Sequence, residues 1–176
     1  MGGEKNCVVP GAFDPITNGH LDIIMRASEI FDKIYVAVFE NSAKKTMFSL
    51  DERRKMAEIA CGELNCAAKI KVESSNGLVI DYAQAKNAGF IIRGARNIID
   101  FEWECDVFRA NCEISGEKYT ETLFFPAKTE HLHISSTFVR EMIIYEKDIS
   151  RYVPEQVEEY INALIKNKRR DLNVKT

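Results

Sequence analysis

The sequence predicts an α/β fold in which parallel strands are joined by crossover helices. Short runs rich in β-branched residues alternate with segments whose apolar residues recur at helical spacing, and this alternation is typical of parallel sheets. A length of 176 residues, 45% of them hydrophobic, supports one ordinary core. We therefore expect a single domain over residues 1–176, with its core at about 6–165 and a solvated basic C-terminal tail at about 166–176.

Five short apolar runs bounded by turn residues predict the strands. The run Phe-Ile-Ile at residues 90–92 is typical of a strand that is buried on both faces of a parallel sheet. Arg93 therefore falls at the carboxyl end of that strand. In chain order, the strands are expected at residues 7–10, 34–38, 70–72, 90–92 and 122–125.

Helical spacing and capping signals predict the helices between these strands. Ser49 and Glu52 form a capping box for the second helix, and Gly89 is expected just after the end of the third. Pro154 is expected at the first position of the last helix. The first helix is expected to carry on one face Leu21, Ile24, Ala27 and Phe31. The later helices are expected at residues 50–61, 78–88, 98–113, 136–145 and from 154 onward.

Composition excludes several classes of protein. A net charge of −3 and a pI near 5.7 argue against bulk capture of nucleic acid or of an anionic membrane. Five cysteines without a C-x-x-C pair indicate neither a disulfide framework nor a zinc site. No signal peptide and no membrane-spanning apolar run is visible, so we expect a soluble cytoplasmic protein.

Two loops that follow strands contain candidate phosphate-binding residues. Ligands of open parallel sheets bind outside the carboxyl ends of the strands. The Gly-rich loop at residues 11–19 lies there and ends at a helix N-terminus, where free amides favour anions and His20 is placed to donate to a phosphoryl oxygen. Taken alone, a histidine at a helix start is more often a surface residue. Lys44 and Lys45 follow the second strand, where a lysine pair either reaches the same crevice or faces solvent.

Arg93 and Arg96 follow the fourth strand and flank a glycine. Their planar guanidinium groups suit bidentate recognition of phosphate. The alternative is that they pair with Asp100, Glu102 or Glu104 in the next helix.

A third candidate segment is Ser135-Ser136-Thr137 at the start of a helix. Three hydroxyls, free amides and Arg140 one turn later would make a phosphate cradle. The alternative is that the hydroxyls are ordinary helix caps.

These segments together resemble the nucleotidyltransferase superfamily, which has an early (T/H)-x-G-H signature and a late I-S-S-T-x-x-R signature. Here the signatures are Thr-Asn-Gly-His at residues 17–20 and Ile-Ser-Ser-Thr-Phe-Val-Arg at residues 134–140. Within the superfamily, the chain is similar to the bacterial phosphopantetheine adenylyltransferase family over about residues 6–165. The matching blocks are residues 10–23, 44–53, 92–96, 100–104 and 134–140.

The resemblance implies a Rossmann-like, doubly wound parallel sheet with helices on both faces and a C-terminal helix, assembled as a homohexamer. It implies transfer of AMP from ATP, with Mg²⁺, to 4′-phosphopantetheine, giving 3′-dephospho-CoA and pyrophosphate in coenzyme A biosynthesis. His20 and Lys44 match the catalytic positions, and no protein side chain is expected to ligate a metal. The positions that match ATP contacts are Ala12, Phe13, His20, Gly94, Ala95, Arg96, Glu104, His131, Leu132, His133, Ile134, Ser135, Ser136 and Thr137. Those that match acceptor contacts are Ala12, Lys44, Val79, Arg93 and Asn111.

Two departures from the family pattern concern the site. Ala12 stands where the family usually has threonine, and the lost hydroxyl removes a hydrogen bond to phosphate worth roughly 1–3 kcal/mol. His131 and His133 stand where the family often has an aromatic and a small or apolar residue. Two other functions stay open: another small-molecule nucleotidylyltransferase, acting on glycerol phosphate or nicotinate mononucleotide, and a nucleotide-binding module without catalysis.

Overall fold

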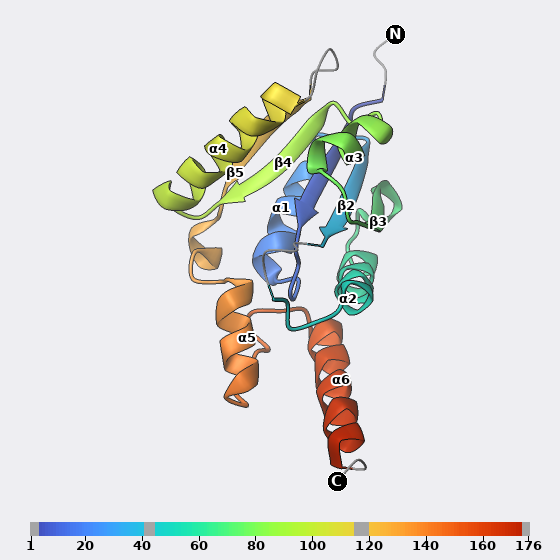
Figure 1. Cartoon of the computed structure of the whole chain (residues 1–176), viewed down its shortest axis with the longest axis vertical. Helices are drawn as coiled ribbons and strands as arrows, with labels where there is room; N and C mark the ends of the chain where they lie inside the picture. Colours follow the sequence, from blue (N-terminus) through green and yellow to red (C-terminus); the bar gives the residue numbers. More distant parts are fainter. Residues whose placement is uncertain (1–3, 41–44, 115–119, 174–176) are drawn as a thin grey trace.

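A five-stranded parallel sheet forms the centre of the molecule (Figure 1). The computed structural model describes residues 4–40, 45–114 and 120–173. The strands are β1 (Asn6–Gly11), β2 (Lys33–Phe39), β3 (Ile70–Ser75), β4 (Phe90–Ala95) and β5 (Glu121–Pro126). They lie in the order β3-β2-β1-β4-β5, and all neighbours pair in parallel. The chain moves outward from β1 to β3 and then crosses back to β4, so the strand order reverses between β1 and β4.

Both faces of the sheet are buried, which explains why its central strands read as continuous apolar runs. In β2, Ile34 and Val36 point into the larger of two cores, whereas Tyr35 and Ala37 point into the smaller core on the other face. Successive side chains of a strand alternate between faces, so a strand with both faces covered needs apolar residues at every position.

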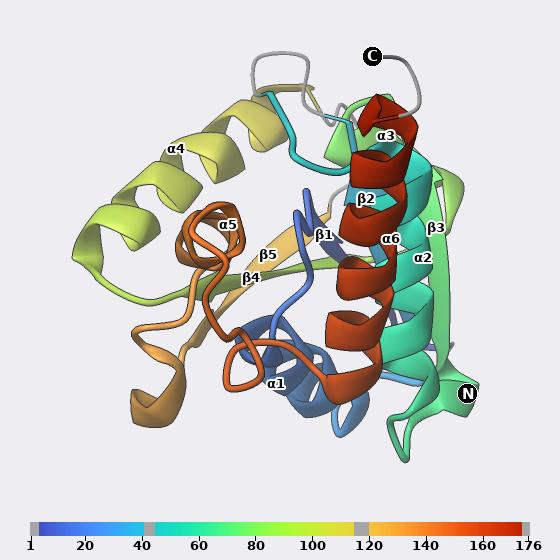
Figure 2. The same cartoon turned by 90° about the horizontal axis from the view of Figure 1, so that it is seen from below.

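Helices cover both faces of the sheet. They are α1 (Asn18–Ser28), α2 (Leu50–Gly62), α3 (Val79–Ala85), α4 (Ile98–Ile114), α5 (Ser136–Ile144) and α6 (Glu155–Asn173), with short 3₁₀ turns at Ala67–Lys69 and Thr129–His131. Residues of α1, α2, α5 and α6 belong to the larger core, and residues of α3 belong to the smaller one. Figure 2 shows α3 and α4 on the side of the sheet opposite α1. The predicted α/β class, the doubly wound sheet and the C-terminal helix are therefore confirmed.

The capping box predicted for α2 is present. Ser49 Oγ accepts a hydrogen bond from the backbone N–H of Glu52 at 3.2 Å, and the Glu52 carboxylate accepts one from the backbone N–H of Ser49 at 2.8 Å. Two of the amides that a helix start leaves without partners are thus satisfied.

The end of α3 differs from the prediction. The helix stops at Ala85, three residues before the expected end, and the left-handed residue that follows it is Asn87, with φ 51°, instead of Gly89. Asn87 N–H donates to Gln84 C=O at 3.1 Å and Ala88 N–H donates to Ala83 C=O at 2.9 Å, which is a Schellman motif. Asparagine tolerates the left-handed region, and this placement buries Ala88 in the smaller core.

Two expectations about helix ends are also corrected. Phe31 lies beyond the end of α1 at Ser28, although it is buried in the larger core as its apolar character requires. The segment expected to be a solvated tail from residue 166 continues α6 as far as Asn173, and Lys168 pairs with Glu52 at 2.9 Å. Pro154 lies just before α6, and its C=O accepts from Val157 and Glu158.

The described helices include none that combines the length and the apolar character required to cross a membrane.

Candidate active site

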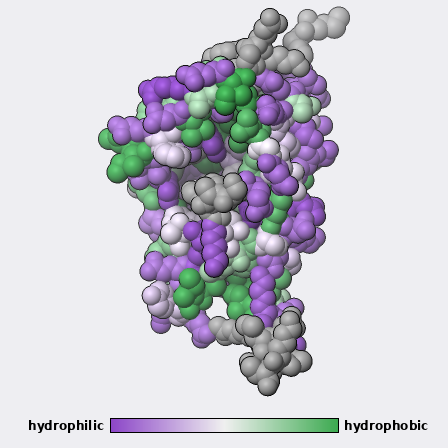
Figure 3. Space-filling model, viewed as in Figure 1, coloured by the Kyte–Doolittle hydropathy of each residue, from purple (hydrophilic) through white to green (hydrophobic). Residues whose placement is uncertain are grey.

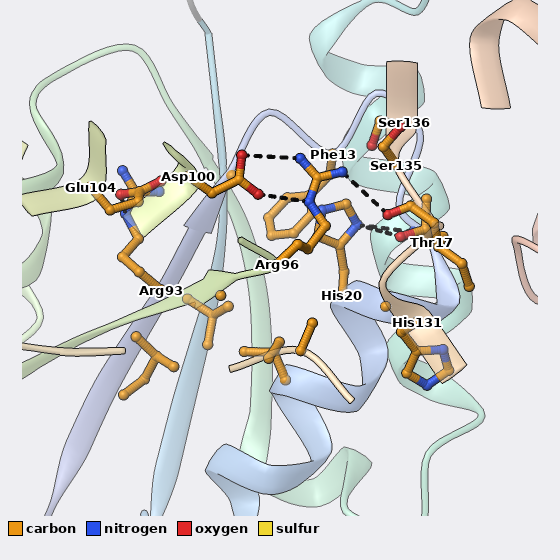
Figure 4. Close-up of a pocket in the computed structure, with 18 of the residues that line it drawn as sticks. Phe13, Thr17, His20, Arg93, Arg96, Asp100, Glu104, His131, Ser135 and Ser136 are labelled. Carbon is orange, nitrogen blue, oxygen red and sulfur yellow. Dashed lines mark hydrogen bonds and ion pairs between the residues drawn. The ribbon is translucent and has the colours of Figure 1, made fainter. Parts of the chain in front are cut away.

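A cavity of about 590 Å³ opens at the carboxyl ends of β1 and β4, where the strand order reverses (Figure 4). Ligands of open α/β sheets bind at such a reversal point. The lining comes from the ends of both strands and the starts of α1, α4 and α5. It comprises Val9, Pro10, Gly11, Phe13, Thr17, Gly19, His20, Ile23, Ile92, Arg93, Gly94, Arg96, Ile99, Asp100, Trp103, Glu104, Ala127, His131, Ile134, Ser135, Ser136 and Thr137.

His20 lies in the first turn of α1 and is held as a neutral imidazole. The backbone N–H of Thr17 donates a hydrogen bond to His20 Nδ1 at 3.0 Å. An amide N–H only donates, so Nδ1 must be the unprotonated nitrogen, and the proton of the neutral ring lies on Nε2. Desolvation and the nearby charge of Arg96 lower the pKa of His20 to about 4. The ring is therefore an uncharged N–H donor at neutral pH.

Arg93 lies within β4, two residues before the end of the strand, and is held in the wall of the cavity. Its Nε pairs with Glu104 Oε2 at 2.8 Å, and its Nη1 donates to Pro10 C=O at 3.2 Å. Burial lowers the pKa of Arg93 while the Glu104 charge opposes that shift, and a guanidinium stays protonated in either case.

Arg96 pairs with Asp100 through both arms of its fork. Nε lies 2.9 Å from Asp100 Oδ2 and Nη2 lies 3.4 Å from Asp100 Oδ1 (Figure 4). Asn97 caps α4 through a 2.8 Å bond from the Asp100 N–H to its side chain, which fixes Asp100 in the first turn of that helix. The alternative of ion pairing is thus confirmed for Arg96 with Asp100 and for Arg93 with Glu104, and both arginines face the cavity.

The hydroxyls at the start of α5 act as caps and also line the cavity. Ser135 Oγ accepts from the Phe138 N–H at 3.1 Å, which confirms the capping interpretation. Ser136 Oγ donates to Pro15 C=O at 2.8 Å. Arg140, expected near the phosphate cradle, is outside the cavity lining and pairs with Asp14 instead.

His131 adds a polar atom to the cavity wall. Its Nδ1 is buried, and no hydrogen-bond partner for it exists in the described part of the chain. A buried polar atom without a partner is costly, so a ligand or water that bonds to it is favoured.

Six predicted site residues are absent from the cavity lining. These are Ala12, Ala95, Leu132, His133, Val79 and Asn111. Ala12 uses its C=O to accept a 2.6 Å hydrogen bond from Arg53, and His133 packs its ring edge-on against Tyr152. Lys44 lies outside the described residues, so its placement stays a prediction.

Among the lining side chains that sequence reasoning did not assign to the site are Asp100 and Trp103. Asp100 follows Arg96 by four residues, and Trp103 directly precedes Glu104, which was predicted to contact ATP. Their place on the first turns of α4 was the available signal, because that helix starts directly after β4.

A metal site made by protein side chains alone is not formed by residues 4–40, 45–114 and 120–173. Within these ranges, no three His, Cys, Asp or Glu side chains gather closely enough to hold an ion. The two carboxylates in the cavity lining, Asp100 and Glu104, are both paired with arginines.

Known proteins similar to this chain share most of its length. Residues 8–142 match the cytidylyltransferase-like family. A phosphopantetheine adenylyltransferase from Nautilia profundicola is 44% identical over 150 residues, covering 85% of this chain and 94% of the relative. Enzymes of the same name from Natranaerobius thermophilus and Finegoldia magna are 40% and 42% identical, covering 89% and 94% of this chain and 94% and 99% of the relatives. The chain belongs to the phosphopantetheine adenylyltransferase family.

Solved structures show the same fold at low sequence identity. A nicotinic acid mononucleotide adenylyltransferase from Plasmodium falciparum, complexed with NaAD, superimposes with a TM-score of 0.70 at 17% identity and covers 92% of this chain and 96% of its own. The same protein complexed with APC gives a TM-score of 0.68. Phosphopantetheine adenylyltransferases are nucleotidyltransferases. Membership of this family therefore confirms the predicted enzyme class.

Proposed function

We propose that this chain transfers the AMP group of ATP to 4′-phosphopantetheine, giving 3′-dephospho-CoA and pyrophosphate in coenzyme A biosynthesis. The observation that carries the proposal is a neutral His20 beside Arg96 in the cavity where the strand order reverses. Identity of 40–44% to phosphopantetheine adenylyltransferases over most of the chain supports this choice of acceptor.

The reaction needs no general base. The acceptor phosphate is a dianion near neutral pH, and one of its oxygens forms a bond to the α-phosphorus of ATP. The bond from that phosphorus to the bridging oxygen breaks, and pyrophosphate leaves with the electron pair on the opposite side. Catalysis then consists of positioning and of electrostatic stabilisation.

His20 is assigned to the α-phosphoryl oxygens. An uncharged N–H donor at Nε2 stabilises the charge on these oxygens during transfer, and its orientation is set in advance by the bond from Thr17. Lys44 is assigned the same task from the acceptor side.

The two arginines are assigned to the phosphates at either end of the reaction. Arg93 binds the acceptor phosphate, and Arg96, with the Ser135–Thr137 helix start, binds the β- and γ-phosphates. Each guanidinium already pairs with a carboxylate, Arg96 through both arms of its fork and Arg93 through Nε, and a phosphate can take the place of either carboxylate. When substrate binds, a phosphate replaces the carboxylate at each arginine. Each guanidinium therefore has an anionic partner both before and after binding.

The remaining positions are assigned by the family pattern. Phe13, Glu104 and residues 131–137 contact the nucleotide, and Val79 and Asn111 contact the pantetheine arm. Mg²⁺ enters with ATP, held by phosphate oxygens and water, because the described residues of the cavity offer no cluster of carboxylates that would hold an ion. It would neutralise part of the triphosphate charge.

A homohexamer is also part of the proposal, with α4 at an interface between copies. None of the side chains of Ile98–Ile114 is buried, although Ile98, Ile99, Phe101 and Trp103 are among its large apolar residues. Figure 3 shows hydrophobic side chains gathered over both ends of α4. An apolar surface of this kind favours association. Light scattering coupled to size exclusion measures the mass directly.

A cytoplasmic location is supported by the thiols. None of the five cysteines, all of which lie in the described ranges, is in a disulfide, as expected in a reducing compartment.

The test is pyrophosphate release from ATP with a panel of acceptors. We expect release with 4′-phosphopantetheine and much less with nicotinate mononucleotide or glycerol phosphate. Faster release with one of the other acceptors would reassign the substrate. No release with any acceptor, although ATP binds, would indicate a nucleotide-binding module.

A further inference from the structure

Phe13 has a backbone conformation that its own chemistry disfavours. Its φ is 46°, in the left-handed region that non-glycine residues rarely adopt. The residue is nevertheless buried, lines the cavity and contacts the ring of His20 edge-on, with centroids 5.1 Å apart. A strained residue of this kind persists only where the surrounding structure holds it.

Arg53 holds the peptide on one side of Phe13. This α2 residue is fully buried and donates to the C=O of Ala12 at 2.6 Å. It also donates to the C=O of Phe39 at 2.9 Å and of Phe48 at 3.2 Å. Glu40 pairs with the same guanidinium at 3.2 Å. One side chain therefore joins the loop after β1 to the end of β2 and the start of α2.

Arg140 holds Asp14, the residue on the other side of Phe13. Its Nη1 donates to the C=O of Asp14 at 2.7 Å and its Nη2 donates to Thr137 Oγ1 at 3.1 Å. The Asp14 carboxylate is buried and accepts hydrogen bonds from the N–H groups of Met47 and Phe48, at 2.9 and 3.0 Å. Neither arginine is part of the cavity lining.

We propose that Arg53 and Arg140 are positioning residues for adenylyl transfer, which fix Phe13 by the carbonyls of its two neighbours, Ala12 and Asp14, and, through the Phe13 ring, orient the imidazole of His20. Arg140 belongs to the late signature, and this assignment makes it a holder of the β1 loop instead of a phosphate ligand. The kinetic part of the inference rests on the proposed function.

The first test is the state of the His20 ring, which needs no substrate. The chain has three histidines, so ¹⁵N-resolved NMR of the imidazoles is simple to assign. In Arg140→Met and in Arg53→Lys, we expect the His20 ring signals to move and its pKa to rise from about 4 toward that of a free histidine. Arg54→Met is the matched control, because this neighbour of Arg53 has, among the described residues, only Asp51 and Glu58 on the surface of α2 as ion-pair partners. It should leave the His20 signals in place.

The second test is the split between kcat and KM. A misplaced donor lowers the rate more than the affinity, so we expect Arg140→Met to lower kcat by about tenfold or more while the KM for ATP changes by less than about threefold. Arg140→Lys keeps one charged donor and should recover part of the rate.

A double-mutant cycle with Phe13→Leu tests whether the effect passes through Phe13. In a variant that already carries Phe13→Leu, adding Arg140→Met should lower kcat only slightly further. Full additivity of the two losses would overturn the proposal.

The outcomes separate this inference from the proposed function. If the wild type releases no pyrophosphate with any acceptor, the proposed function fails while the His20 NMR still tests the positioning. Unchanged His20 signals in folded Arg140→Met would overturn the inference, and so would an increased KM with constant kcat, which would indicate a direct phosphate ligand. If Arg140→Met does not fold, Arg140→Gln, which removes the charge and shortens the side chain, is subjected to the same measurements and the same criteria.

Discussion

Thr17 and His20 are joined by a 3.0 Å hydrogen bond in which the backbone N–H of Thr17 donates to His20 Nδ1. This bond fixes the tautomer of the imidazole, and the site around it keeps the ring uncharged. The signature Thr-x-Gly-His therefore has a physical meaning in this chain: a helix start holds a neutral donor at the end of β1.

The charge of His20 leads to a prediction about pH. Its pKa is about 4, below the ordinary 6.5, because of desolvation and the charge of Arg96. Between these two pH values the imidazole binds a proton in the unfolded chain but not in the folded chain. The free energy of unfolding therefore decreases as pH falls from 6.5 through 4. NMR titration of the ring should show it neutral at pH 5. A pH–rate profile would be harder to interpret, because the acceptor phosphate itself titrates at about pH 6 and would also change the rate. A midpoint near 6.5 in the folded protein would contradict the structure.

Gly11 is predicted to be intolerant of a side chain. A Cβ at this position would lie 2.8 Å from Cζ of Phe13, so the buried ring or the loop that holds it must shift. We expect Gly11→Ala to lower the free energy of unfolding by about 1–3 kcal/mol and to reduce turnover.

Gly62 is the matched control for Gly11. It is the last residue of α2 and has open space around its Cα, so Gly62→Ala should raise stability by up to about 0.5–1 kcal/mol. Urea unfolding compares the two variants. Equal effects would show that the contact with Phe13 has no energetic consequence.

Glu73 should contribute to stability in a pH-dependent way. Partial burial raises its pKa, but bonds from Lys71, Lys86 and the Tyr82 hydroxyl outweigh this and hold the value at about 2. Because the folded pKa lies below the ordinary 4.5, the contribution is complete above that pH and is lost as pH falls toward 2.

Glu73→Gln should therefore lower stability at pH 7 and weaken its dependence on pH between 4.5 and 2. Urea unfolding at several pH values measures both effects, with the exposed Glu29→Gln as control. The same acid dependence in Glu73→Gln and wild type would disprove the assignment.

Trp103 provides an optical probe of the cavity. It is the only tryptophan of the chain, it lines the cavity, and 69% of its surface is exposed. ATP that enters the cavity should change its environment, so we expect saturable changes in its emission that are absent from Trp103→Phe. Constant emission at ATP concentrations where calorimetry detects binding would place the nucleotide elsewhere.

The sheet, most helices and the place of the cavity follow from local patterns in the sequence. Alternating apolar runs and the Ser49 capping box depend on residues near one another in the chain, and the place of the cavity follows from the general rule for parallel sheets. These features were predictable for that reason, whereas the doubly wound order of the strands came only from the family resemblance.

The features that were missed depend on tertiary contacts. Ala12 meets Arg53 across 41 positions and Arg140 meets Asp14 across 126, and no local pattern reports such pairs. The end of α3 at Ala85, by contrast, was missed for a local reason: Gly89 gave a stronger signal than Asn87, which a Schellman motif holds in the left-handed region.

The central claim is that a neutral His20 stabilises the transition state of AMP transfer. It is tested most directly by pyrophosphate release from ATP and 4′-phosphopantetheine in wild type and His20→Ala, with melting curves to verify folding. Removal of one preorganised donor predicts a fall in kcat of about 10²-fold or more, with a KM for ATP within a few-fold of wild type. An unchanged kcat in folded His20→Ala would contradict the account.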